Sequence, residues 1–429
     1  MTRALIIAAA NSGAGKTTLT LGLLRALKNR GLSVRAAKSG PDYIDPAFHA
    51  VACDHASINL DAWAMSPAAL RHYAATQGGD LLIIEGAMGV LDAGADGQGS
   101  VADLAKILSI PLVMVIDIAK QAQSAALALA GLSKLRPDLE ISGAILNRAA
   151  SPKHCAMAQK SVNAAGFQTF GHLNRDPLFS LPERHLGLVQ AAENAQLDEF
   201  LNELAENLEK SVDIDAIIAS ARPLSTPQNP PQMLPPLGQN IAVAADLAFG
   251  FAYPHLLSDW HAQGASIHPF SPLNDEGPSP KADAIYLPGG YPELHAGKLA
   301  QAAIFKAGMQ TATQNQTLIY GECGGYMVLG DGLIDAQGHH HEMLGFLPLT
   351  TSFETRKLCL GYRRLTPHTN PIFQTPLLAH EFHYSTITHQ GGAKPLFQAS
   401  DATHSTLGDM GMQKRHIIGS YAHVIAPAV

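Results

Sequence analysis

One segment of the chain combines a cysteine with closely spaced glycines. In the run Leu318 to Tyr326, an apolar stretch of strand length leads into Gly-Glu-Cys-Gly-Gly, and a short apolar segment compatible with a helix follows. Glycines two residues before and after Cys323 allow the tight turn of a nucleophile elbow. Backbone N–H groups at the helix start are expected to lower the pKa of the thiol. The pattern predicts thioester chemistry, and the alternative is a buried cysteine in a glycine-rich turn.

A second chemical signature lies near the amino terminus. The apolar run Ala4 to Ala10 has strand length, residues 11–18 read Asn-Ser-Gly-Ala-Gly-Lys-Thr-Thr, and leucines at helical spacing follow. A strand, a glycine-rich turn and a helix in this order are the context of a P-loop, although Ala10 replaces the usual first glycine. Lys16 would reach the terminal phosphates of a nucleotide, and the Thr17 hydroxyl would bind Mg²⁺. The predicted nucleotide-binding residues are Ser12, Gly13, Ala14, Gly15, Lys16, Thr17 and Thr18.

Carboxylates follow two of the strands expected in the first half of the chain. Asp42 and Asp45 come just after a predicted strand over 33–37, and Glu85 ends the apolar strand predicted over 80–85. Doubly wound sheets bind ligands at the carboxyl ends of their strands, so these groups could hold Mg²⁺ or orient a substrate. The Asp-x-x-Asp spacing is also common in ordinary capped turns, which leaves both interpretations open for Asp42 and Asp45.

Strands and helices alternate through the first 210 residues. Buried strands are expected over 111–117 and 141–146, and helices over 123–135 and 185–210. This alternation predicts an α/β fold with a parallel sheet and right-handed crossovers.

A Pro-rich segment divides the chain. Residues 222–238 contain six prolines in a polar setting, which is typical of a semi-rigid linker. The predicted organisation is a domain over 1–220, a linker over 221–239 and a second domain over 240–429.

The second domain offers partners for a cysteine nucleophile. A strand over 284–287 ends in a turn with Gly289 and Gly290, whose backbone N–H groups could form an oxyanion hole. Candidate bases lie in the segments 380–385 and 419–423.

Composition excludes several classes of protein. The chain has 429 residues, 46% of them hydrophobic and 15% charged, which indicates two or three well-packed domains. A net charge of −7 with no basic run argues against a nucleic-acid partner. The four cysteines lack the paired spacing of disulfide or zinc frameworks. No signal-peptide pattern and no apolar run of membrane-spanning length is seen, so we expect a cytoplasmic protein without a membrane partner.

Several motifs together resemble one family. They are Gly-Pro-Asp-Tyr-Ile-Asp-Pro (40–46), Asn-Leu-Asp (59–61), Ile-Glu-Gly-Ala-Met-Gly (84–89), Leu-Pro-Glu-Arg-His-Leu-Gly (181–187), Leu-Pro-Gly-Gly-Tyr-Pro-Glu (287–293), Gly-Glu-Cys-Gly-Gly (321–325) and Glu-Phe-His-Tyr-Ser (381–385). In this order, over nearly the whole chain, the sequence resembles the glutamine-dependent a,c-diamide synthases of cobalamin biosynthesis, which act on cobyrinic or hydrogenobyrinic acid. The resemblance implies a P-loop domain similar to dethiobiotin synthetase, followed by a class I glutamine amidotransferase domain.

The resemblance also implies roles for individual residues. Cys323 would attack the glutamine amide with His423 as its base, while the backbone of Gly289, Gly290 and Gly324 would stabilise the oxyanion. Released ammonia would reach the first domain, where ATP would phosphorylate a peripheral carboxylate of the corrin ring. Ammonia would then displace phosphate, and two rounds would give the a,c-diamide.

Further roles carry over by position. The residues implied for Mg²⁺ are Thr17, Asp42 and Glu85, and those implied for the corrin substrate are Tyr43, Asp45 and Asp92. The short carboxyl terminus resembles the aerobic branch and favours the metal-free substrate. The family suggests a homodimer.

One departure from the class I pattern concerns the histidine. Class I amidotransferases commonly carry His-x-Glu, whereas Val424 and Ile425 follow His423 here. Glu381 and His383 are the candidates for orienting His423, and the alternative is that no residue does.

Two other interpretations remain. The chain could be another amidoligase of this architecture, similar to cobyric acid synthase or to a cell-wall ligase. It could also be a partitioning-type ATPase switch with a silent amidotransferase-like module, but the signature lysine of such switches is absent, since positions 10 and 11 are Ala and Asn.

Overall fold

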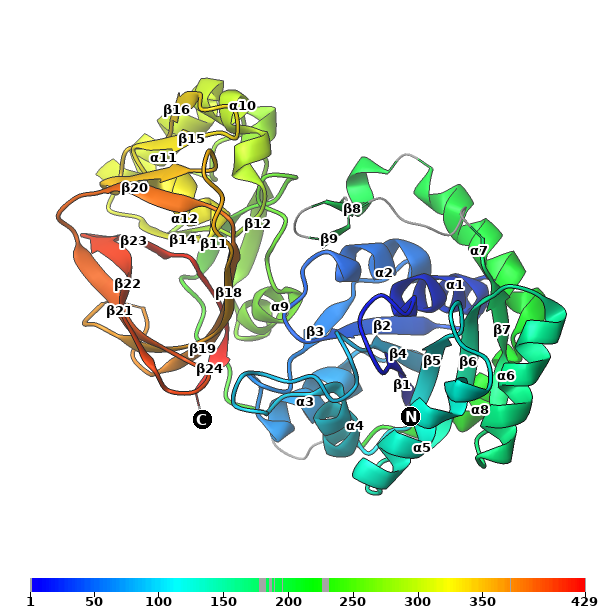
Figure 1. Cartoon of the computed structure of the whole chain (residues 1–429). Coiled ribbons are helices and arrows are strands. Elements are labelled where there is room, and N and C mark those ends of the chain that lie inside the picture. The colour runs from blue at the N-terminus through cyan, green and yellow to red at the C-terminus, as the bar shows by residue number, and fades with distance from the viewer. Residues whose placement is uncertain are drawn as a thin grey trace. The chain divides into compact units, whose positions relative to one another are not determined.

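The computed structural model describes residues 2–176, 183–184, 187–188, 190–194, 196–225, 231–370 and 372–428 (Figure 1). The chain divides into two compact units, Met1–Pro231 and Gln232–Val429. Over the described residues, no helix combines the length and the apolar character needed to cross a membrane.

The first unit is built on a parallel sheet with the strand order β3-β2-β4-β1-β5-β6-β7. Its strands are β1 (Arg3–Ala9), β2 (Val34–Ser39), β3 (Ile58–Leu60), β4 (Leu81–Glu85), β5 (Leu112–Asp117), β6 (Ile141–Ala149) and β7 (Thr169–Asn174). Its helices are α1 (Lys16–Asn29), α2 (Asp45–Cys53), α3 (Pro67–Thr76), α4 (Val101–Leu108), α5 (Ala126–Leu135), α6 (Pro152–Ala164), α7 (Leu197–Ser211) and α8 (Ile214–Ser220).

Helices cover both faces of this sheet. In Figure 1, α1 and α2 lie on one side of the strands, and α3, α4 and α5 lie on the other. Apart from Arg3 at the start of β1 and Glu85 at the end of β4, the central strands β1 and β4 are apolar, and all their residues except Arg3 are buried, as a strand covered on both faces requires. Because all these strands run parallel, the carboxyl ends of β1, β2 and β4 meet at one edge, which is where the predicted P-loop and Glu85 lie.

The end of the first unit differs from the prediction in its last long helix and in the start of the Pro-rich segment. The helix expected over 185–210 begins only at Leu197, where leucines start to recur at helical spacing. Before it, β9 (Gly187–Leu188) pairs with β8 (Glu183–Arg184), and residues 185, 186, 189 and 195 lie outside the described residues. The first residues of the Pro-rich segment form β10 (Arg222–Pro223), which pairs antiparallel with β1. Residues 226–230 of that segment also lie outside the described residues.

The second unit contains a ten-stranded mixed sheet in the order β12-β11-β13-β14-β23-β22-β21-β18-β19-β24, and a four-stranded sheet in the order β16-β15-β17-β20. Its strands are β11 (Asn240–Ala244), β12 (Ser266–Phe270), β13 (Ala284–Leu287), β14 (Leu318–Glu322), β15 (Gly332–Ile334), β16 (His340–Glu342), β17 (Leu349–Ser352), β18 (Cys359–Pro367), β19 (Leu377–His383), β20 (Thr386–Gln390), β21 (Lys394–Asp401), β22 (Thr406–Lys414), β23 (Ile417–Ser420) and β24 (Ala422–Pro427). Its helices are α9 (Pro254–Ala262), α10 (Ala296–Gln301), α11 (Ala303–Gln314) and α12 (Gly324–Leu329).

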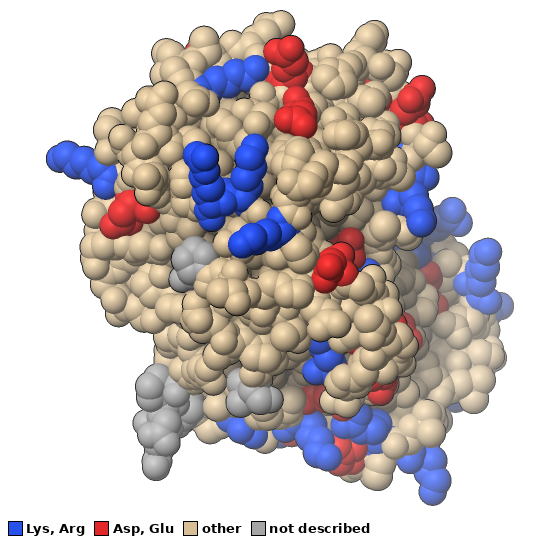
Figure 2. Space-filling view, turned by 90° about the vertical axis from the view of Figure 1, so that its left-hand side faces the viewer, with Lys and Arg blue, Asp and Glu red and all other residues tan. Residues whose placement is uncertain are grey.

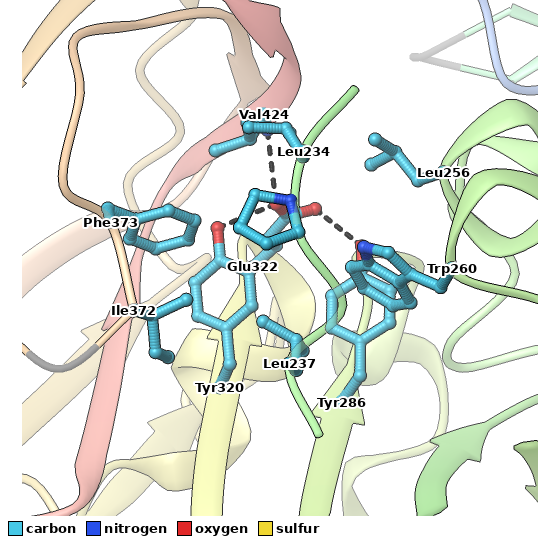
Figure 3. Close-up of a pocket in the computed structure, with 11 residues that line it drawn as sticks. Leu234, Leu237, Leu256, Trp260, Tyr286, Tyr320, Glu322, Ile372, Phe373 and Val424 are labelled. Carbon is cyan, nitrogen blue, oxygen red and sulfur yellow. Dashed lines mark hydrogen bonds between the residues drawn. The ribbon is translucent and has the colours of Figure 1, made fainter. Parts of the chain in front are cut away.

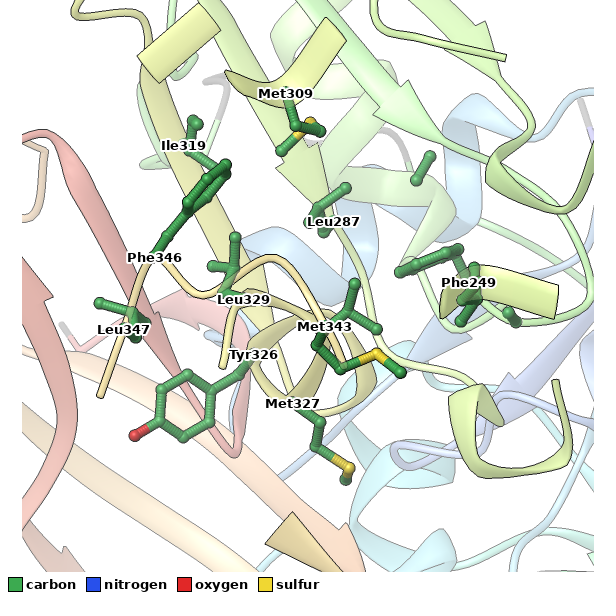
Figure 4. Close-up of a cluster of buried hydrophobic side chains, with 14 of the residues drawn as sticks. Phe249, Leu287, Met309, Ile319, Tyr326, Met327, Leu329, Met343, Phe346 and Leu347 are labelled. Atoms are coloured by element: carbon green, nitrogen blue, oxygen red, sulfur yellow. The ribbon is translucent and has the colours of Figure 1, made fainter. Parts of the chain in front are cut away.

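An apolar cluster supports the helix that follows β14. Tyr326, Met327 and Leu329 of α12 pack with Leu287 of β13 and with Phe249 (Figure 4). All five side chains are almost fully buried, so α12 is held by packing although it is only six residues long.

Charged groups are sparse on the surface. On the face drawn in Figure 2, Lys, Arg, Asp and Glu side chains all occur among a much larger area of uncharged residues. This agrees with the low charged fraction of the sequence.

Candidate active sites

Cys323 occupies the sharp turn between β14 and α12. Its backbone has φ 46° and ψ −102°, a conformation that costs free energy for a residue with a side chain. Glycine is required at positions 321 and 325 because neighbouring atoms leave no room for a side chain there. A Cβ atom on Gly325 would overlap the carbonyl oxygen of Leu287, and one on Gly321 would lie 2.7 Å from Leu329 Cδ1. The predicted nucleophile elbow is therefore present.

The residues expected to assist Cys323 lie around the same turn. His423 lies on β24 and is 1% exposed, and its ring packs so closely on Gly289 that a Cβ there would overlap it. A Cβ on Gly324 would lie 3.0 Å from the backbone nitrogen of Gly290. The turn after β13 thus meets both the elbow and the histidine, as an oxyanion hole beside a cysteine–histidine pair requires.

The protonation states at this site differ in part from expectation. Burial, reinforced by the charge of Glu293, raises the pKa of the Cys323 thiol above its ordinary value, while the Gly324 backbone N–H lowers it. The expected lowering of the thiol pKa is therefore wrong for this conformation, because a motif does not show how deeply the thiol is buried. Burial, with the neighbouring His380 and His383, lowers the pKa of His423 to about 3, so its imidazole is neutral and only weakly basic in this conformation.

Glu381 and His383, which the sequence offered as partners for His423, are paired with each other. His383 Nε2 lies 2.9 Å from Glu381 Oε1, and Arg363 Nε donates to Glu381 Oε2 at 2.6 Å. Cys359, Glu381 and His383 lie close enough together to bind a metal ion. Both oxygens of the Glu381 carboxylate are already paired, one with Arg363 and the other with His383.

The P-loop of the first unit has the predicted position between β1 and α1. Ser12 to Gly15 form the loop, and Gly15 adopts a left-handed φ of 91° before the first turn of α1, which carries Lys16, Thr17 and Thr18. Lys16 Nζ donates to the carbonyl oxygens of Met88 at 2.5 Å and Asn11 at 3.3 Å. Burial, followed by the charge of Lys38, lowers the pKa of Lys16. Its ammonium thus lies among backbone acceptors at the place where phosphates bind a P-loop.

A buried charge cluster joins the P-loop to β2, β4 and α2. Thr17 Oγ1 donates to Glu85 Oε1 at 2.6 Å. Lys38 Nζ lies 2.8 Å from Glu85 Oε1 and 2.5 Å from Asp45 Oδ2, and His49 Nε2 lies 2.6 Å from Glu85 Oε2. Glu85 and His49 are fully buried. Two of the predicted acidic residues, Asp45 and Glu85, thus form ion pairs with the same lysine, Lys38.

The charges in this cluster shift one another's pKa values. Burial alone would lower the pKa of Lys38, but Asp45 and Glu85 raise it overall. Burial alone would raise the pKa of Glu85, but Lys38 and His49 bring it well below its usual range. Burial and the charge of Asp42 raise the pKa of Asp45 to about 7 against the opposing effect of Lys38.

The other predicted residues lie on loops near this edge of the sheet. Asp42 Oδ1 accepts the backbone N–H groups of Ile44 and Asp45, which is a capping contact at the start of α2. Tyr43 is partly buried in the same loop. Asp92 is exposed, and its Oδ2 accepts the N–H of Gly89.

Three polar residues of this site were not predicted. Lys38 and His49 contact Glu85, and Asn147 Nδ2 donates to the carbonyl oxygen of Ala14 in the P-loop at 2.8 Å. None of these three residues lies in the same short sequence motif as the residue to which it is hydrogen-bonded. The only available signal was the position of Lys38 and Asn147 at the carboxyl ends of predicted strands.

Replacing Lys38 by methionine is expected to destabilise the protein strongly at pH 7. The change leaves Glu85 and Asp45 buried without their cation, which costs about 3 kcal/mol or more of unfolding free energy. The difference from wild type should shrink as the pH falls from 7 to 4, because the stranded carboxyls then take up protons. Urea denaturation at pH 7 and pH 4 measures the difference in unfolding free energy between variant and wild type. Lys153→Met, at an exposed position, is the matched control. An equal loss at both values would contradict the assignment.

Known proteins match the chain in both units and along nearly its whole length. Residues 5–189 match the CobQ/CobB/MinD/ParA nucleotide binding domain, and residues 240–428 match the CobB/CobQ-like glutamine amidotransferase domain. The hydrogenobyrinate a,c-diamide synthase of Rhizobium meliloti (strain 1021) is 49% identical over 423 residues, 98% of each chain. The enzyme of the same name from Brucella abortus is 50% identical over 426 residues, again 98% of each chain. That of Rhodobacter capsulatus is 47% identical over 432 residues, 99% of each chain.

The positions of the cysteine elbow and of the P-loop agree with these matches. The elbow and its histidine lie in the part similar to amidotransferases, and the P-loop with its acidic edge lies in the part similar to nucleotide-binding domains. Since near-complete relatives at about half identity share both parts, the chain belongs to the hydrogenobyrinate a,c-diamide synthase family.

Proposed function

We propose that this enzyme amidates the a and c carboxylates of hydrogenobyrinic acid, using ATP and ammonia that it releases from glutamine. The observation that carries the proposal is the presence, in one chain, of a cysteine elbow beside a neutral histidine and of a P-loop with a buried acidic partner. A glutaminase alone has no need of the second site, and a simple ATPase has no need of the first.

In the glutaminase half, Cys323 attacks the side-chain amide carbon of glutamine. His423 takes the thiol proton and passes it to the departing ammonia, while the backbone N–H groups of Gly289, Gly290 and Gly324 stabilise the oxyanion. Water then hydrolyses the thioester to glutamate. Because the resting thiol is protonated, its proton must be transferred to His423 as glutamine binds.

In the ligase half, the substrate carboxylate attacks the γ-phosphate of ATP, giving an acyl phosphate and ADP. Ammonia adds to the acyl carbon and phosphate leaves, so one amide costs one ATP and one glutamine. The P-loop and Lys16 bind the phosphates. Asp45, Tyr43 and Asp92 are the residues that we assign to the corrin.

We assign Mg²⁺ to the oxygen donors at the end of β4, where it would have to compete with Lys38 and His49 for the Glu85 carboxylate. The Thr17 hydroxyl and the Glu85 carboxylate lie within hydrogen-bond distance of each other, and hard oxygen ligands of this kind are those that Mg²⁺ prefers. When bound, the ion offsets the negative charge of the phosphates. Asp42, which we also assign to this ion, lies at the neighbouring strand end.

The expected substrate is the metal-free corrin. All three relatives described above carry the name of hydrogenobyrinate, which supports it over cobyrinate. Offering both acids at equal concentration with ATP and glutamine, we expect kcat/KM to be about 10-fold or more higher for hydrogenobyrinic acid, a difference of about 1.4 kcal/mol. Mass spectrometry of the products measures the ratio. Equal values, or a preference for the cobalt form, would contradict this assignment.

The competing interpretations predict other outcomes. A cobyric acid synthase-like ligase would accept an a,c-diamide and leave the diacid unchanged. An ATPase switch with a silent module would hydrolyse ATP without forming any amide.

Two broader properties belong to the same proposal. The family resemblance suggests a homodimer, which light scattering of the purified enzyme tests. The four free cysteines, including the thiol at the elbow, suit a reducing compartment such as the cytoplasm.

A further inference from the structure

Glu322, the residue directly before the nucleophile, is held by donors from three strands. Its carboxyl group is 1% exposed and accepts hydrogen bonds from Tyr286 Oη at 2.7 Å, Tyr320 Oη at 2.6 Å and the backbone N–H of Val424 at 3.0 Å (Figure 3). Tyr320 and Glu322 share one face of β14, since side chains two residues apart on a strand point the same way. The carboxyl group therefore has one fixed position.

That position is beside the imidazole of the glutaminase site. Glu322 Oε2 lies 3.9 Å from His423 Nδ1, and both side chains are 1% exposed. The bond from the Val424 N–H also fixes the backbone next to His423. At this distance in a buried setting, a carboxylate interacts strongly with a charge on the ring, and a small shift would allow a hydrogen bond.

The surroundings of Glu322 shield it from solvent. The carboxyl group borders a small cavity that offers about 20 Å³ to the centre of a water molecule, and apolar side chains such as Leu256, Trp260 and Phe373 line it (Figure 3). The cavity has room for about one water molecule, so bulk solvent does not screen the carboxylate from the imidazole.

We propose that Glu322 is the positioning residue for His423, and that its carboxylate, clamped by Tyr286 and Tyr320, orients the imidazole and stabilises the imidazolium formed when Cys323 gives up its proton. The acidic member of the triad would then come from the residue before the nucleophile. It would replace the glutamate that class I amidotransferases commonly carry two residues after the histidine. This inference rests on the proposed glutaminase activity.

The charge state of Glu322 makes the role dependent on pH. Burial raises the pKa of this carboxyl to about 7, although the hydrogen bonds from Tyr286 and Tyr320 oppose the rise. The titratable groups that face it are these two tyrosines, Cys323 at the end of the same strand and His423 on β24, while Trp260 of α9 is uncharged. The carboxylate that the role requires is populated above about pH 7 and lost below it.

The test is the isosteric variant Glu322→Gln, assayed for glutamine hydrolysis. We expect kcat to fall by about 10²-fold or more with little change in KM, because the amide cannot stabilise an imidazolium. In wild type, kcat should rise with pH through an ionisation near 7, and this rise should be absent in the variant. Glu322→Asp, which keeps the charge, should restore part of the rate and the rise with pH. The surface change Glu342→Gln is the matched control.

The outcomes separate this inference from the proposed function. If wild type and Glu322→Gln hydrolyse glutamine at the same rate and with the same pH profile, Glu322 has no such role, while the function stands as long as wild type makes the amide from glutamine. If wild type itself hydrolyses no glutamine, the proposed function fails.

Two tyrosine variants keep the inference testable should Glu322→Gln fail to fold. Tyr286→Phe and Tyr320→Phe each remove one hydrogen bond that lowers the pKa of Glu322, so the rise in kcat should move to higher pH in both. A rise that stays in place in both variants would overturn the inference.

Discussion

Replacing Cys323 by serine is expected to abolish amide formation from glutamine while amide formation from free ammonia continues. The serine hydroxyl is far less easily ionised than a thiol, and the lowered pKa of His423 makes removal of a hydroxyl proton harder still. We expect the glutamine-dependent rate to fall by about 10³-fold or more. The ligase site lies in the other unit, where neither Lys16 nor Glu85 is altered.

The measurement is product formation with each nitrogen source in parallel. Cys155→Ser, on α6 of the other unit, is the matched control and should behave like wild type. If the Cys323 variant still used glutamine, or if neither form accepted ammonia, a scheme with two separate sites would be wrong.

Replacing Lys16 by alanine is expected to reduce amide formation from either nitrogen source while glutamine hydrolysis continues. Lys16 Nζ lies among the carbonyl oxygens of Asn11 and Met88, in the loop that we propose binds the terminal phosphates of ATP. Without its charge, we expect amide formation from both glutamine and ammonia to fall by about 10²-fold or more. Glutamine hydrolysis should persist, because Cys323 and His423 do not depend on the P-loop.

Separate assays for glutamate and for the amide product measure the two activities. Lys28→Ala, on the same helix but half-exposed, is the control and should retain both. Loss of glutamine hydrolysis alone, with amide formation from ammonia intact, would contradict the assignment.

The features that the sequence predicted well are local ones. The elbow needs only a strand, a cysteine and two glycines within five residues, and the P-loop needs only a strand, a short loop and a helix. The residue types within each motif set its backbone turn, so the pattern predicts the local conformation, although Leu287 at the elbow and Glu85 and Asn147 at the P-loop contact these turns from elsewhere in the chain. The α/β fold follows for a similar reason, from the alternation of buried strands and helices.

The features that the sequence missed depend on distant parts of the chain. Lys38 and Glu85 are 47 residues apart but directly opposite each other in the pairing of β2 with β4. His49 reaches the same carboxylate from a helix. Glu322 was visible beside Cys323 but had no apparent partner, because Tyr286 and Val424 come from strands far away in the sequence. Only the sheet order brings such residues together.

The deep burial of the Cys323 thiol has a consequence for the lifetime of the enzyme. Peroxides and alkylating agents react with thiolates far faster than with thiols. A thiol that burial keeps protonated until glutamine arrives is thus a poor target for oxidants during idle periods. The burial that keeps this thiol protonated also protects it, so ageing of the unliganded enzyme should begin at more accessible sulfurs such as that of Cys359.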